Sequence, residues 1–130
     1  MKPGMPEREE SPAVKLELLG PAATIVHVRG ELDMRTAHQF RAVLRQAVSG
    51  DRPVIVDLLE CPFIDSLSIG MLITTQRALA EKHERTTPLA IVAKGFVVRA
   101  LELLGKDFAP PIYATVRDAL EAVTSGDGRP

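Results

Sequence analysis

Two polar residues, Asp65 and Ser66, stand where a predicted helix begins, after a buried strand and a short turn. The first N–H groups of a helix lack partners within it, and a serine hydroxyl at that point can satisfy one of them. The same position can present the hydroxyl for phosphorylation, because a phosphate would meet free N–H groups and the positive end of the helix dipole. The residue types leave both interpretations of Ser66 open, a helix cap and a phosphoacceptor.

Two kinds of known active site fit this neighbourhood poorly. The run from Ser66 to Gly70 is close to a nucleophile elbow, but its first glycine is missing, and His83 is the only histidine after it, without an acid placed to complete the triad. Asp57, in a predicted central strand, suggests a response-regulator receiver, but that fold needs an acidic pair after its first strand, and here the first strand leads into a second one. We expect no catalytic residues and interpret Asp57 as a strand-end or turn residue.

The histidines and the cysteine show no metal-binding pattern. His27, His38 and His83 lie far apart in the sequence, at no spacing typical of shared coordination, and we expect them to face solvent. Cys61 is the single cysteine, which excludes an internal disulfide and zinc-finger spacing. The sequence therefore predicts neither a metal site nor a cofactor.

Composition narrows the class of protein further. The chain has 130 residues, of which 45% are hydrophobic and 25% charged, as in an ordinary single domain. Its 16 basic and 17 acidic side chains give a net charge of -1, which argues against direct binding of nucleic acid. No apolar run is long enough to span a membrane and no signal peptide is recognisable, so we expect a cytoplasmic protein.

Apolar periodicity places these residues on alternating strands and helices. Strand patterns at 14–18 and 24–29 lie close enough to form a hairpin. The apolar run at 54–59 is typical of a central strand that is covered on both faces. Shorter strands are expected at 89–93 and 112–113. The predicted helices span 36–48, 66–82, 96–104 and 115–124.

This order predicts an α/β domain with a mixed sheet of four or five strands and about four helices packed on it. Residues 1–13 are expected to form a disordered leader, 14–124 the domain and 125–130 a flexible tail. The first helix is expected to begin with a capping box in which Thr36 is the cap and Gln39 its partner. The expected core includes Val26, Val28, Phe40, Leu44, Val54, Val56, Ile69, Leu72, Leu89, Ile91, Leu101 and Leu120.

Two spaced motifs surround the candidate serine. One is Asp57-Leu58 followed by Phe63-Ile64-Asp65-Ser66, and the other is Gly30-Glu31-Leu32-Asp33 followed by Thr36-Ala37. Together they resemble the signature of STAS domains, a family named for sulfate transporters and anti-sigma factor antagonists. The resemblance spans roughly residues 13–124 and implies the family's fold, a sheet backed by helices.

The resemblance implies a protein-binding switch rather than an enzyme. In the family, the unphosphorylated domain binds an anti-sigma factor that is also a serine kinase, and a sigma factor is released. ATP-dependent phosphorylation of the serine ends that binding, and a serine phosphatase restores it. The family's acceptor position falls on Ser66, and Ser68 is a weaker competitor because it stands where the family has glycine.

Leu67 and Ser68 depart from the family pattern, which has a small Ser or Thr and then a glycine at these positions. The departure keeps a second function open, a STAS scaffold that is not phosphorylated and joins partners in a bacterial signalling complex. The sequence leaves the kinase, the sigma factor and the oligomeric state open.

The partner surface is expected to form from the two motif loops and the start of the second helix. Leu67 is the expected exposed apolar contact, the alternative being that it folds back onto the domain. The candidate partner-binding residues are Asp33, Thr36, Asp65, Ser66, Leu67 and Ser68.

Overall fold

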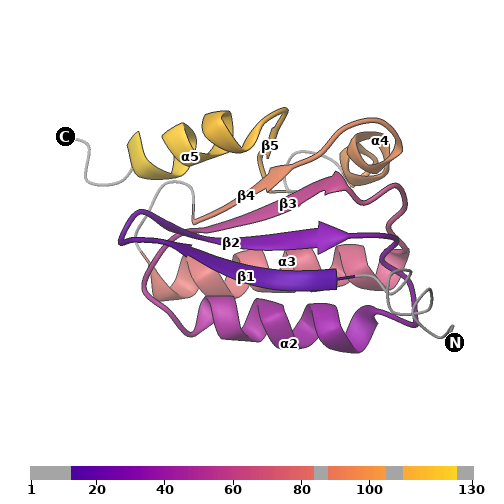
Figure 1. The fold of residues 1–130 in the computed structure, drawn as a ribbon, viewed down its shortest axis with the longest axis horizontal. Coiled ribbons are helices and arrows are strands. Elements are labelled where there is room, and N and C mark those ends of the chain that lie inside the picture. The colour runs from indigo at the N-terminus through magenta and orange to yellow at the C-terminus, as the bar shows by residue number, and fades with distance from the viewer. Residues whose placement is uncertain (1–12, 84–87, 105–109, 126–130) are drawn as a thin grey trace, which may run out of the picture.

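A mixed five-stranded sheet organises the computed structural model, which describes residues 13–83, 88–104 and 110–125 (Figure 1). The strands lie in the sheet in the same order as in the chain. They are β1 (Ala13–Leu19), β2 (Ala23–Arg29), β3 (Val54–Glu60), β4 (Leu89–Val92) and β5 (Ile112–Tyr113). The predicted α/β class and mixed sheet are confirmed.

The sheet opens with an antiparallel hairpin and continues with parallel strands. β1 and β2 pair antiparallel, as expected of a hairpin, and Val14 lies opposite Val28. β3 pairs parallel with β2 on one side and with β4 on the other, and β5 adds a short parallel edge. β3 therefore lies in the middle of the sheet, as its uninterrupted apolar sequence predicts.

Four helices within the described residues complete the fold. They are α2 (Ala37–Val48), α3 (Ser66–Lys82), α4 (Phe96–Glu102) and α5 (Val116–Ser125). α2 and α3 lie side by side on one face of the sheet, and α5 lies on the other (Figure 1). Three helices match the predicted bounds within one residue at each end, whereas α4 ends two residues earlier than expected.

The two faces of the sheet carry separate apolar clusters, because side chains alternate along each strand. Val54 and Val56 belong to the cluster under α2 and α3, whereas Ile55 belongs to the cluster under α5. Ten of the twelve expected core residues are at most 3% exposed. The other two, Ile69 and Leu120, are only partly buried and pack against the clusters from outside.

A polar bridge crosses the three strands β1, β2 and β3. His27 Nδ1 lies 3.0 Å from Asp57 Oδ2, and His27 Nε2 lies 2.6 Å from Glu17 Oε1. Burial alone would lower the pKa of His27, but the hydrogen bonds to the two carboxylates outweigh it and raise the pKa above its usual value. Two predictions are wrong here. His27 is only partly exposed instead of facing solvent, and Asp57 lies inside β3 instead of at a strand end or turn.

The ends of the chain lie mostly outside the described residues. Of the expected leader only Ala13 is described, as the first residue of β1, and of the expected tail only Ser125, as the last residue of α5. In the part of the chain that the structure describes, no helix combines the length and apolarity needed to cross a membrane.

Candidate functional site

The loops that follow β2, β3 and β4 lie together at the C-terminal ends of these strands, because the three strands are parallel. We call this region, formed by residues 30–36, 61–67 and 93–96, the loop edge. α2 and α3 both begin there (Figure 1). Both sequence motifs end at the loop edge, so the fold brings together two segments that lie about thirty residues apart in the chain.

Backbone hydrogen bonds join the two motif loops. The Leu32 N–H donates to the Phe63 carbonyl at 2.9 Å, and the Asp65 N–H donates to the Leu32 carbonyl at 3.0 Å. Leu32 and Ile64 thereby form a parallel bridge, and both side chains are buried. The two loops therefore form one unit, which holds the residues of both motifs in fixed relative positions.

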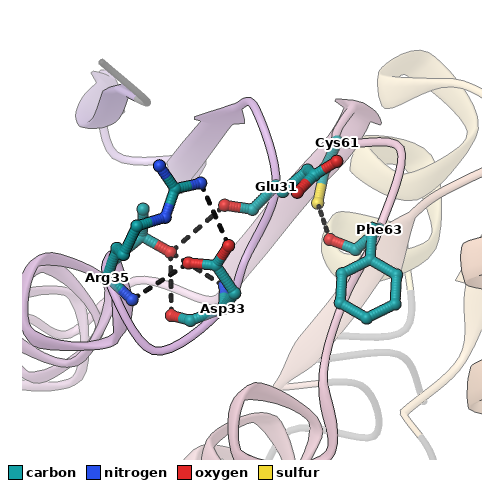
Figure 2. A network of polar contacts seen from close by, with 6 residues as sticks. Glu31, Asp33, Arg35, Cys61 and Phe63 are labelled. Atoms are coloured by element: carbon teal, nitrogen blue, oxygen red, sulfur yellow. Dashed lines mark hydrogen bonds and ion pairs between the residues drawn. The ribbon is translucent and has the colours of Figure 1, made fainter. Parts of the chain in front are cut away.

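Polar contacts also fold the first motif loop on itself (Figure 2). The Asp33 N–H donates to Thr36 Oγ1 at 3.0 Å, and this hydroxyl lies 3.1 Å from the carbonyls of Glu31 and Asp33. Thr36 is only 4% exposed and caps no N–H of α2, so the predicted capping box with Gln39 is wrong. The threonine hydroxyl therefore stabilises the loop and does not cap the helix.

Arg35 holds the carboxylate of Asp33 at the surface of this loop (Figure 2). Its backbone N–H donates to Asp33 Oδ1 at 2.9 Å, and its Nη2 donates to Oδ2 at 3.1 Å. The hydrogen bond from the Arg35 side chain lowers the pKa of Asp33 below its usual value. Asp33 is therefore ionised at neutral pH and its charge is partly balanced.

Cys61 stabilises the second motif loop. Its Sγ donates to the Phe63 carbonyl at 3.1 Å (Figure 2). The side chain is buried, and this burial raises the pKa of the thiol. Cys61 is therefore a packed structural residue of the second motif loop.

Asp65 caps α3, and Ser66 does not. The Asp65 carboxylate accepts the Ser68 N–H at 2.9 Å, and its backbone has the extended conformation of an N-cap residue. Ser66 is the first residue of the helix and its side chain is exposed. The interpretation of Ser66 as the helix cap is therefore wrong, and its hydroxyl stays accessible.

The two departures from the family pattern have opposite environments. Leu67 is 47% exposed, as expected of a docking contact, whereas Ser68 is fully buried. The Ser68 Oγ forms no hydrogen bond with any described residue. A kinase cannot reach this hydroxyl in the folded domain, whereas the side chain of Ser66 is exposed. Among the candidate partner-binding residues, Thr36 and Ser68 shape the loops from inside and offer no surface to a partner.

Ser68→Ala should raise the free energy of unfolding by about 1 kcal/mol, because a buried hydroxyl without a partner costs about 1–3 kcal/mol and alanine favours helix. Urea unfolding followed by circular dichroism measures the change. Ser66→Ala removes an exposed hydroxyl from the same turn and should stay within about 0.5 kcal/mol of the unmodified chain. Equal stability of Ser68→Ala and the unmodified chain would show that an ordered water satisfies the Ser68 hydroxyl.

Exposed apolar side chains also lie along the loop edge, and three of them are absent from the surface predicted from the sequence. Met34 is 83% exposed, Phe63 39% and Phe96 46%. The rings of Phe63 and Phe96 stack with centroids 5.7 Å apart and an interplanar angle of 13°. Phe96 could have been noticed in the sequence, because Val97 and Leu101 define the buried side of α4 and leave Phe96 outside it. We call Met34, Phe63, Leu67 and Phe96 the apolar rim.

A groove between α2 and α3 opens beside Ser66. Its volume is about 570 Å³, and Ser66 and Leu67 form part of its wall. Apolar side chains such as Leu44 and Met71 line it from the two helices. The groove thus connects the loop edge with the surface between the helices.

Comparison with known proteins identifies the family. The family described as "Mlab, STAS domain" matches residues 19–108 of the chain. The chain belongs to the STAS domain family. This STAS domain is 29% identical over 105 residues to the anti-sigma-F factor antagonist RsfB of Mycobacterium tuberculosis, an alignment that covers 78% of this chain and 82% of RsfB.

Solved structures agree with this family. The crystal structure of an anti-sigma factor antagonist from Mycobacterium paratuberculosis is 31% identical, with a TM-score of 0.74 over 88% of this STAS domain and 95% of that chain. The Bacillus cell fate determinant SpoIIAA in its phosphorylated form is 20% identical, with a TM-score of 0.61 over 84% and 97%. The second likeness shows a shared fold.

Proposed function

We propose that this STAS domain is an anti-sigma factor antagonist whose binding to its partner is turned off by phosphorylation of Ser66. Relatives that are named anti-sigma factor antagonists support the class of activity. One observation supports the switch most directly: Ser66 is exposed at the start of α3, next to the capping Asp65 and to Leu67 of the apolar rim. A modification there changes the surface without removing a bond that holds the fold.

The apolar rim is the proposed contact surface. Aromatic and large aliphatic side chains at the centre of an interface supply most of the binding energy when a partner removes them from water. Phe63 and Phe96 are already stacked, so they lose little conformational freedom on binding. Asp33, held by Arg35, places a charge beside this surface. The proposed partner is an anti-sigma factor with serine kinase activity, which would otherwise hold a sigma factor.

Phosphorylation would oppose this contact through charge. The Ser66 oxygen forms a bond to the γ-phosphorus of ATP, the bond from that phosphorus to the bridging oxygen breaks to leave ADP, and the hydroxyl proton passes to a base on the kinase. The phosphate adds about -1.5 to -2 charges. Asp65 is the next residue, so a partner that covers this surface would have to bury like charges together. A serine phosphatase would restore the binding form by hydrolysis.

Incubation with the partner kinase and ATP, followed by mass spectrometry, should place phosphate on Ser66 and leave Ser68 unmodified. Ser66→Ala should take up no phosphate and should keep its affinity for the anti-sigma factor after incubation with ATP. Ser66→Asp should bind at least about tenfold more weakly, a change of about 1.4 kcal/mol. Phosphate on another residue alone, or none from an active kinase, would contradict the switch and favour an unphosphorylated scaffold.

A further inference from the structure

Two arginines of α2 share the groove with Ser66. Arg41 and Arg45 both line it, and no acidic side chain does. Both arginines are exposed, and neither forms a side-chain hydrogen bond or an ion pair with a described residue. The site of the proposed modification therefore shares a groove with two positive charges that have no partner among the described residues.

The packing of the two helices places Arg41 nearer to Ser66 than Arg45. α2 and α3 run in the same direction, and Lys82 Nζ fixes their far ends together by donating to the carbonyls of Val48 at 2.7 Å and Gly50 at 2.9 Å. Ser66 lies at the opposite end of α3. Arg45 stands four residues, or about 6 Å, farther along the groove than Arg41. Helical side chains lean toward the N-terminus, which brings the Arg41 guanidinium closer to the loop edge.

We propose that Arg41 binds the phosphate once Ser66 is modified and holds it across the mouth of the groove. This inference rests on the proposed function, because the phosphate comes from the phosphorylation of Ser66. A guanidinium has paired N–H donors that match two oxygens of a phosphate, and it keeps its charge at every physiological pH. The bound phosphate then covers part of the apolar lining formed by Leu44 and Met71.

This pairing has two consequences that charge repulsion alone would not give. The phosphate oxygens are engaged, so a phosphatase must displace Arg41 before it can reach the phosphorus atom. The groove is also closed at the end next to Leu67, so a partner segment that enters it from the apolar rim is excluded by shape as well as by charge.

Phosphoserine placed at position 66 during translation, by expansion of the genetic code, tests the inference without any kinase. A ³¹P NMR titration of this protein should give a second phosphate pKa about one unit below the usual value of about 6, because Arg41 favours the dianion. Arg41→Gln should return that pKa to about 6 and should speed dephosphorylation by alkaline phosphatase several-fold. Arg41→Lys, which keeps the charge without the paired donors, should lie between the two.

Arg77→Gln is the matched control, since Arg77 is an exposed arginine of α3 that does not line the groove. It should change neither the pKa nor the rate of dephosphorylation. An unchanged titration in Arg41→Gln would overturn the inference, and a larger change in Arg45→Gln would overturn the assignment to Arg41. Because phosphoserine is installed directly, a kinase that fails to modify Ser66 would contradict the proposed function and leave this result standing.

Discussion

Leu67→Asp should lower the affinity for the anti-sigma factor by about a hundredfold, or about 2.7 kcal/mol. Leu67 is 47% exposed beside Ser66, so a docked partner would bury it and could not accept an unpaired carboxylate in its place. The free energy of unfolding should change little, because Leu67 lies outside both apolar clusters. Isothermal titration calorimetry with the purified anti-sigma factor measures the affinity, and circular dichroism confirms the fold.

The control for this experiment is Leu18→Asp. Leu18 is 55% exposed, but it pairs with Thr24 near the start of β2. It therefore lies at the N-terminal end of β2, opposite to the end where the loop edge and Ser66 lie. This variant adds the same charge to a comparably exposed leucine and should bind as the unmodified chain does. If both variants bind with unchanged affinity, the partner contacts another surface. If Leu18→Asp alone weakens binding, the loop edge is not the contact.

Phe40→Ala should lower the free energy of unfolding by about 3–5 kcal/mol. Phe40 is fully buried in the cluster between α2 and the sheet, and removal of its ring leaves a cavity in a close-packed interior. For a domain whose total stability is about 5–15 kcal/mol, this loss is a large fraction. Urea unfolding of Phe40→Ala measures the difference.

Gln39→Ala is the companion variant, because Gln39 is the exposed neighbour of Phe40 in the same helix. Its stability should stay within about 0.5 kcal/mol of the unmodified chain. A loss of less than about 1 kcal/mol in Phe40→Ala would show that α2 does not pack on the sheet as described.

Local patterns were enough to predict most of the fold. β3 could be placed in the centre of the sheet because a strand covered on both faces needs apolar residues without alternation. α3 begins where predicted because Asp65 caps it by accepting the N–H of a residue three positions later. Such signals depend on neighbours in the sequence, so they can be recognised without the tertiary structure.

The residues that were misplaced depend on contacts between distant segments. The buried side of α3 includes two polar residues, Ser68 and Thr75, so hydropathy could not identify it and favoured Ile69 instead. Thr36 has the spacing of a helix cap, but its hydroxyl forms hydrogen bonds with the carbonyls of its own loop instead of with the helix. The partnership of His27 with Asp57 becomes visible only when β2 and β3 pair.

The candidate site was only partly predictable for the same reason. Ser66 and Leu67 stand next to each other in one motif, so their exposure follows from the start of a single helix. Phe96 reaches the same surface from a third segment, and its stacking on Phe63 requires the parallel order of β3 and β4. The motifs therefore predicted the exposure of Ser66 and Leu67 but gave no sign of Phe96.

The cap that Asp65 provides has a consequence for how fast a cell could respond. Because Asp65 caps the first turn of α3, the fold does not depend on the Ser66 hydroxyl, which is the proposed site of phosphorylation. Each molecule could then be converted and converted back many times in place, without unfolding and without new protein synthesis. The response time would then depend on how fast the kinase adds the phosphate and how fast the phosphatase removes it.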